Sequence, residues 1–334
     1  MVTLSTEAEV SIREAVTLLE MKDMNGDGKD EVIVTTVAGD VRVIALEPGP
    51  GAFRELAVMR DLPPSSAMSI GDVVGDGRPD IVLGGLDDTL RVITLGKGGL
   101  KLRTVCPLGT LPTSVCATNV QGDQRAEVIV GSNDKALRCY GWFDTALDKL
   151  AHKVVEQPAF SVQPLFSQGV PYTRVVYGDE SRHIYVYQYA DDRLHEAMRA
   201  ETRGPVSLVA TGRIAGKRND DIVTVSDGRQ IGLFSVDQGT IKPLDNIRAP
   251  GVVTSVRVGS LYDQGSQQQQ IVVCEGNSHL AVMALEGRRL NPVGSLKTER
   301  KAAEARIAVG NPMGEGTRIV QAVGNSFYVI AVQT

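Results

Sequence analysis

The 334-residue sequence is poor in aromatic residues and histidine, and it carries no familiar catalytic motif. Its four histidines, His152, His183, His195 and His279, are scattered and lack the spacing of a metal-binding motif. No nucleophile elbow, phosphate-binding loop or dinucleotide fingerprint occurs. We therefore expect a protein that is not an enzyme, although catalytic groups that converge from distant segments leave no motif in a sequence.

An excess of charge of one sign is also missing. The formal net charge is −5, and both signs are interspersed along the chain. A nucleic-acid-binding protein usually presents a basic stripe, but the densest basic stretch, residues 288–306, is interrupted by Glu299 and Glu304. We therefore expect no nucleic-acid partner.

Signals for membranes and export are absent as well. No apolar run approaches the roughly 20 residues that span a bilayer, and residues 1–7 have neither the basic nor the apolar region of a signal peptide. The cysteines, Cys106, Cys116, Cys139 and Cys274, show no CxxC spacing. We expect a cytoplasmic protein without a transmembrane segment; the alternative is a secreted or periplasmic protein whose signal peptide has been removed.

The sequence does contain a repeat, which recurs seven times. Each copy has an apolar strand, a polar loop, a second apolar strand, a tight turn rich in Gly, Asn and Asp, and a third strand. The second strands begin at Glu31, Asp80, Glu127, Arg174, Asp221, Gln270 and Arg318. These starts are 49, 47, 47, 47, 49 and 48 residues apart. A fourth, more polar strand completes most copies.

Four strands in a period of this length are typical of a propeller blade. We predict an all-β fold, a seven-bladed β-propeller of four-stranded blades that forms one domain over residues 1–334. The expected blades cover residues 14–60, 61–109, 110–157, 158–203, 204–250, 251–300, and 301–334 together with 1–13. The seventh copy ends after its third strand, so we expect residues 1–13 to supply its outer strand and close the ring.

The first loops carry a family resemblance. Residues 23–31 read Asp-Met-Asn-Gly-Asp-Gly-Lys-Asp-Glu, and residues 72–80 read Asp-Val-Val-Gly-Asp-Gly-Arg-Pro-Asp. Both resemble the FG-GAP/VCBS repeat of integrin α-subunit heads and related propellers. Residues 119–127 are a degraded copy, and the later blades keep the strands and turns but lose the loop chemistry. The resemblance covers the whole chain as architecture and its first quarter as a site motif.

The resemblance implies structural calcium in the first blades. Side-chain oxygens of Asp23, Asn25, Asp27 and Glu31, with the carbonyl of Lys29, would supply the ligands in blade one. Glu31 stands where the family usually has Asp. Blade two offers Asp72, Asp76 and Asp80. The alternative is a set of metal-free turns in which Asp and Asn side chains bond their own backbone.

The turns between second and third strands are the predicted partner-binding face. Charged groups on rigid hairpins suit a specific polar recognition surface. The residues proposed for this face are Asp87, Asp88, Asp134, Lys135, Asp179, Glu180, Arg182, Asp227, Arg229 and His279. The alternative interpretation is that these residues only solubilise the turns.

The function predicted from these features is a protein-interaction scaffold, or one subunit of a larger assembly, with protein partners. A rigid ring that displays varied turns and lacks a catalytic motif supports this interpretation. One alternative is an extracellular carbohydrate-binding or carbohydrate-cleaving propeller. Another is a quinone-type or outer-membrane-assembly propeller, against which the Asp-rich first loop argues.

Overall fold

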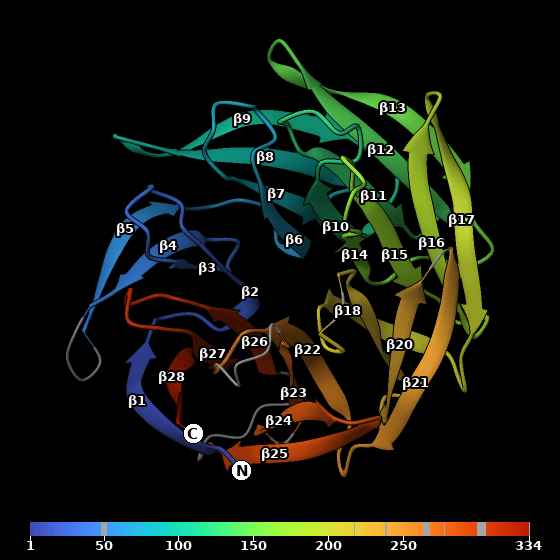
Figure 1. Ribbon diagram of the computed structural model, residues 1–334. Coiled ribbons are helices and arrows are strands. Elements are labelled where there is room, and N and C mark those ends of the chain that lie inside the picture. Colours follow the sequence, from blue (N-terminus) through green and yellow to red (C-terminus); the bar gives the residue numbers. More distant parts are fainter. Residues whose placement is uncertain are drawn as a thin grey trace.

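The computed structural model describes residues 1–47, 52–216, 218–237, 239–262, 268–276, 278–298 and 305–333. It shows seven antiparallel sheets of four strands each, arranged as a ring (Figure 1). This confirms the predicted all-β, seven-bladed propeller. Among the described residues, no helix has the length and apolar character needed to cross a membrane.

The first four blades follow one another along the chain. Blade one consists of β2 (Val16–Lys22), β3 (Glu31–Thr36), β4 (Val41–Leu46) and β5 (Phe53–Met59). Blade two consists of β6 (Ser65–Gly71), β7 (Asp80–Gly85), β8 (Thr89–Gly96) and β9 (Gly99–Pro107). Blade three consists of β10 (Pro112–Thr118), β11 (Glu127–Ser132), β12 (Ala136–Phe143) and β13 (Ala146–Val154). Blade four consists of β14 (Val162–Leu165), β15 (Arg174–Gly178), β16 (His183–Ala190) and β17 (Arg193–Glu201).

The last three blades complete the ring. Blade five consists of β18 (Val206–Gly212), β19 (Asp221–Ser226), β20 (Gln230–Asp237) and β21 (Thr240–Arg248). Blade six consists of β22 (Val253–Gly259), β23 (Gln270–Glu275), β24 (His279–Glu286) and β25 (Arg289–Lys297). Blade seven consists of β26 (Ala305–Gly310), β27 (Arg318–Val323), β28 (Ser326–Gln333) and, from the other end of the chain, β1 (Thr3–Ser11).

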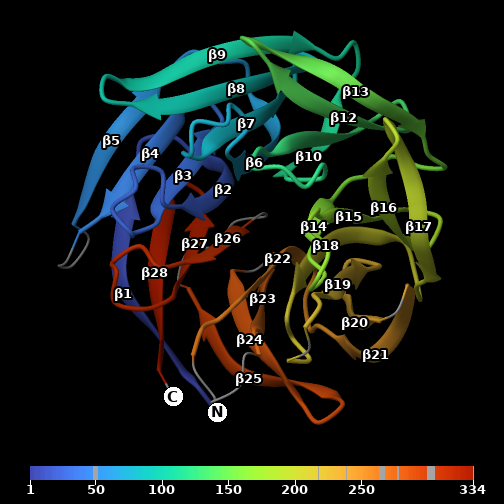
Figure 2. The same ribbon diagram turned by 45° about the horizontal axis from the view of Figure 1, so that its top comes forward.

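The first strand of each blade lies next to the ring axis (Figure 2). Residues of β2, β6, β10, β14, β18, β22 and β26 together line a central channel of about 230 Å³. An ion pair of 2.7 Å between Glu20 Oε1 on β2 and Arg257 Nη2 on β22 connects blades one and six. The channel is therefore narrow and partly polar.

The second strands begin at the seven residues that the repeat predicted. All six residues of β3, β7, β11, β19 and β23 are buried. A strand in the middle of a blade packs against neighbouring blades on both of its faces, so its central residues are mostly apolar and do not alternate with exposed polar ones. These strands form the core of the propeller.

The ring closes through the N-terminal strand, as predicted. β1 pairs antiparallel with β28 from Thr3 opposite Gln333 to Ser11 opposite Ser326. Asn325 Nδ2 donates a hydrogen bond of 2.8 Å to the carbonyl of Ile12. The two ends of the chain thus share one sheet, which covers an edge that would otherwise be unpaired.

A register shift occurs at the same place in every blade, between the third and fourth strands. Such bulges increase the local twist of a strand. The outer strand of each blade carries one edge without a ladder partner, and a twisted edge is a poor template for another chain. The repeated bulge therefore protects the circumference of the ring from edge-to-edge association.

The cysteines and aromatic residues mostly fill the space within and between blades. All four cysteines lie in the described part of the chain and form no disulfide. Tyr177 stacks on Tyr185 with ring centroids 5.2 Å apart and on Tyr187 at 5.9 Å. These three tyrosines are buried, so they pack in blade four and are not available for stacking on a carbohydrate.

Candidate functional site

The ring has two faces, which are built from different connections. The loops from first to second strands and the turns from third to fourth strands lie on one face, called here the loop face. The hairpins from second to third strands and the links between blades lie on the other, called the hairpin face. The candidate calcium ligands belong to the loop face and the predicted partner-binding residues to the hairpin face.

The last residue of each acidic loop anchors that loop from within the core. Glu31 Oε2 accepts the backbone N–H of Met24 at 2.8 Å, and Asp80 Oδ2 accepts that of Val73 at 2.9 Å. In blade five Asp221 Oδ2 makes the same bond with Ile214 at 3.0 Å. This anchor was not recognised in the sequence, although the recurrence of an acidic or amide residue at the start of the second strand was its signal.

An amide can replace the anchoring carboxylate. In blade six Gln270 Oε1 accepts the N–H of Leu261 at 2.9 Å. The anchor therefore needs a hydrogen-bond acceptor and not a charge or a metal. Burial favours the neutral acid: it raises the pKa of Glu31 to about 7 and that of Asp80 to about 6, and it also raises the pKa of Glu127.

The remaining ligand candidates of blade one bond the backbone of their own loop. Asp23 Oδ1 accepts the N–H of Gly26 at 2.7 Å, and its Oδ2 accepts that of Gly28 at 2.9 Å. Both glycines have φ above +80°, a conformation that costs glycine little. Asp27 Oδ1 accepts the N–H of Lys29 at 2.9 Å. The loop thus has the geometry of the metal-free alternative.

The amide of Asn25 decides whether a cation fits blade one. Its Nδ2 donates to Glu31 Oε1 at 2.8 Å and to Asp27 Oδ2 at 3.2 Å, so a donor group lies between the two carboxylates. A cation at this point would require the amide to turn and present its oxygen. Across the described residues, no three acidic, histidine or cysteine side chains are grouped as metal ligands. Calcium in this loop stays a prediction.

Blade two repeats this arrangement. Asp72 Oδ1 accepts the N–H of Gly75 at 2.8 Å and Oδ2 accepts that of Gly77 at 2.9 Å. Asp76 Oδ1 accepts the N–H of Arg78 at 3.1 Å. The carboxylates of the blade-two candidates are therefore also engaged by the loop itself.

The hairpin face differs from the prediction at Asp179, which is fully buried. Its Oδ1 accepts the backbone N–H of Ser181 at 2.9 Å, whereas its Oδ2 has no hydrogen-bond partner within the described chain. Asp179 directly follows β15, at the position of Ser132 and Ser226 in blades three and five, and only Glu180 begins the turn. The prediction of an exposed charge at Asp179 was wrong because this position still faces the core.

Two more of the predicted charges are held in ion pairs. Arg91 Nη1 donates to Asp87 Oδ1 at 2.9 Å, and Arg138 Nη1 donates to Asp134 Oδ1 at 3.1 Å. The hydrogen bonds from these arginines lower the pKa of Asp87, and lower that of Asp134 to about 2. These carboxylates therefore hold the hairpins in shape in addition to facing solvent.

The other predicted residues of the hairpin face remain accessible. Lys135, Glu180, Arg182 and Asp227 are exposed, and Asp88, Arg229 and His279 are half-buried. Asp88, Lys135, Arg182 and Asp227 have φ between 50° and 67°, which is the left-handed conformation expected of tight hairpin turns. The structure thus presents charged side chains on short, rigid turns.

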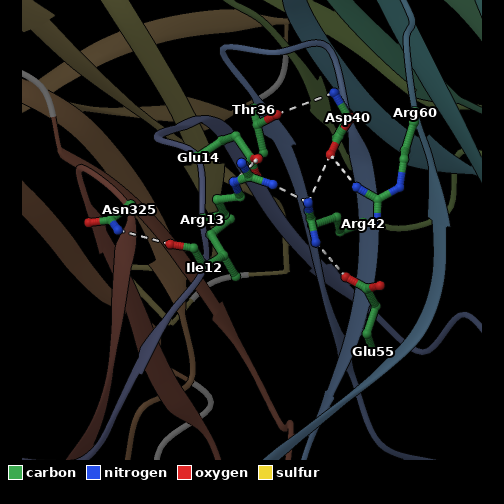
Figure 3. Close-up of polar contacts among 9 residues, drawn as sticks. All are labelled: Ile12, Arg13, Glu14, Thr36, Asp40, Arg42, Glu55, Arg60 and Asn325. Atoms are coloured by element: carbon green, nitrogen blue, oxygen red, sulfur yellow. Dashed lines mark hydrogen bonds and ion pairs between the residues drawn. The ribbon is translucent and has the colours of Figure 1, made fainter.

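Blade one carries a larger version of the hairpin ion pair (Figure 3). Arg42 on β4 is buried; its Nη2 contacts Asp40 Oδ2 at 2.8 Å and Glu14 Oε2 at 3.1 Å, and its Nη1 contacts Glu55 Oε2 at 2.7 Å. Arg60 reaches Asp40 at 3.4 Å. The recurring arginine of the third strand, in Val41-Arg, Leu90-Arg and Leu137-Arg, was the sequence signal for these pairs.

The hairpin face also carries exposed apolar side chains. Val37 and Leu86 lie at hairpin tips and are 58% and 54% exposed. Phe160 and Val252 lie just before the innermost strands β14 and β22 and are 44% and 51% exposed. Phe160 also lines the central channel. These four residues, called the channel-mouth patch, were not identified from the sequence because single apolar residues in turns give no periodic signal.

The fold defines a seven-bladed β-propeller. Residues 23–83, in its first two blades, match the family described as FG-GAP-like repeat. Two similar solved structures are crystals of BBS1N in complex with ARL6DN, one soaked with lead and one with mercury. Each is 10% identical to this chain with a TM-score of 0.71; the alignments cover 96% and 97% of this chain and 93% of the other. No curated protein matches the sequence.

Proposed function

We propose that this propeller is a protein-interaction scaffold without enzymatic activity and that it binds a protein partner on its hairpin face. The observation that carries the proposal is the channel-mouth patch, in which four large apolar side chains from blades one, two, four and six are exposed on one face. Single exposed apolar residues are ordinary on a protein surface. We infer an interaction site because these four large side chains are exposed on the same face of the ring.

The surroundings of the patch support this proposal. Protein interfaces combine an apolar centre, which is desolvated on binding, with a polar rim that sets specificity. Here Lys135, Glu180, Arg182 and Asp227 supply exposed charges of both signs on the surrounding turns. Because the turns are short, little conformational entropy would be lost when a partner orders them.

The comparison with solved structures supports the binding of a protein partner by a propeller of this fold. The BBS1N propeller was crystallised in complex with ARL6DN. A propeller of this architecture can therefore bind a protein partner, and we extend that type of function to this chain.

The proposal is tested by changing the apolar patch while leaving the fold intact. A photo-crosslinking amino acid at position 86 would first identify the partner in extracts of the native source. We then expect the double variant Leu86→Asp/Val252→Asp to weaken binding of the purified partner by about thirtyfold or more, the size of a 2 kcal/mol hot spot. Calorimetry should show little change in melting temperature because both side chains are exposed.

Phe143→Asp is the matched control. Phe143 is 49% exposed at the end of β12 and belongs to the loop face. It should leave partner binding unchanged. Equal weakening by Phe143→Asp, or wild-type binding by the double variant, would contradict docking on the hairpin face, and glycan binding by the purified protein would favour the carbohydrate alternative.

We also propose that blade one binds structural calcium, which would pin the loop at residues 23–31. If it does, calcium should raise the melting temperature, EDTA should reverse the increase, and Asp27→Ala should abolish the response. Stabilisation by mass action should reach about 2.7 kcal/mol at a hundredfold excess of calcium over its dissociation constant. A melting temperature that responds to neither calcium nor EDTA would contradict this proposal and favour the metal-free alternative.

A further inference from the structure

A depression of about 770 Å³ opens on the loop face between blades four, five and six. The innermost strands of these blades, β14, β18 and β22, lie side by side near the axis (Figure 2). Its walls include Phe166 and Gln168 from blade four, Arg213 and Arg218 from blade five, and Arg257 and Gln269 from blade six. The volume lies in the range of sites for small molecules, which is roughly 300–1,000 Å³.

The charge of this depression is mainly positive. Among its described lining residues, three are arginines and only Asp220 is acidic. The Asp220 carboxylate already accepts the backbone N–H of Phe166 at 3.0 Å. Arg218 is exposed and has no side-chain partner within the described chain. Arg257 is held in place by Glu20, at 2.7 Å, and by the carbonyl of Val256, at 3.0 Å.

The loop of blade five shares its length and its buried anchor with the blade-one loop but has the opposite net charge. Residues 213–221 have the same length as residues 23–31, and Asp221 forms the same buried anchor as Glu31. Within this shared frame, Arg213 stands at the position of Asp23, and Gly216, with φ of 67°, stands at that of Gly26. A loop that presents carboxylates in blade one therefore presents a guanidinium in blade five.

The blade-four wall adds an apolar surface. Phe166 is 57% exposed although it is a large aromatic side chain. The loop that it begins, residues 166–173, has no charged residue. A ligand held by the arginines would therefore meet an aromatic ring beside its charged group.

We propose that this depression is a binding site for a small organic anion, one that carries a phosphate or carboxylate group and a planar apolar part. The planar guanidinium group of Arg218 matches the geometry of either oxyanion and can donate two parallel hydrogen bonds to it, and Arg213 adds positive charge to the same wall. Arg257, which is paired with Glu20, lines the channel side of the depression. The planar part packs against Phe166. The site lies on the face opposite the channel-mouth patch and does not depend on the proposed function.

Isothermal titration calorimetry of the full chain at low ionic strength tests the site. The probes are inorganic pyrophosphate, citrate and phenyl phosphate, which separate phosphate from carboxylate recognition and add an aromatic part. We expect saturable binding of at least phenyl phosphate. Arg218→Gln should weaken it about tenfold or more, because a hydrogen bond to a charged group contributes that much. Phe166→Ala should weaken phenyl phosphate but not pyrophosphate.

Arg78→Gln provides the control for general electrostatics. Arg78 is exposed on the same face in blade two, outside the depression, and removing it changes the net charge equally. It should leave the affinity of every probe unchanged, and the melting temperatures of all three variants should match that of the original protein. The site is disproved if no probe binds saturably or if Arg78→Gln weakens binding as much as Arg218→Gln does.

Discussion

Removal of residues 1–13 is expected to abolish the stable monomer. The deletion removes β1 and its ladder with β28, and it uncovers the core side of blade seven. Val2, Leu4, Val10 and Ile12 are all buried, and each buried aliphatic side chain contributes about 2 kcal/mol. Their combined loss is comparable with the 5–15 kcal/mol stability typical of a whole domain, so the truncated chain should aggregate or pair through the free edge of β28.

Size-exclusion chromatography and calorimetry would measure this effect. A synthetic peptide of residues 1–13 should restore the monomer if strand pairing is the cause. In the intact chain, Val10→Asp should be strongly destabilising because Val10 is 2% exposed, whereas Thr3→Asp changes an exposed residue of the same strand and should be tolerated. A truncated chain that stays monomeric and equally stable would show that closure by β1 is dispensable.

Arg42→Met should be the most destabilising single substitution on the hairpin face. Methionine keeps the length of the side chain but removes the positive charge shared by Glu14, Asp40 and Glu55. Loss of one partner from a buried ion pair costs about 3–5 kcal/mol. We expect the lower end of this range, about 3 kcal/mol in the free energy of unfolding, because Glu14 and Glu55 are partly exposed and solvent screens their charges.

Urea unfolding would measure the cost, and two further variants test its cause. Arg54→Met breaks an ion pair with Glu47 whose side chains are 66% and 49% exposed, so it should change stability by less than about 1 kcal/mol. Asp40→Asn should lower the free energy of unfolding less in the Arg42→Met variant than in the original protein. In the Arg42→Met variant the buried Asp40 carboxylate has lost Arg42 as a partner, and the substitution removes that charge. Additive effects of Arg42→Met and Asp40→Asn would show that the two groups do not stabilise each other.

The sequence by itself determined the repeat, the strands and the closure of the ring. Each second strand is buried on both faces, so its apolar residues are consecutive in the sequence and can be recognised there. β3 and β19, for example, begin at the expected Glu31 and Asp221. The pairing of β1 with β28 could be predicted in the same way, because the seventh copy supplies only three strands of its blade. Such features follow from the short-range periodicity of the chain.

Only the tertiary structure decided which side chains are exposed and which of them act together. Asp179 is of a residue type that is common in turns, yet the packing of blade four buries it. The channel-mouth patch combines Leu86 of blade two with Val252 of blade six. The depression on the loop face combines Arg218 of blade five with Arg257 of blade six. The physical reason is that closing the ring sets the distance between segments far apart in the sequence, and no local pattern of residues records that distance.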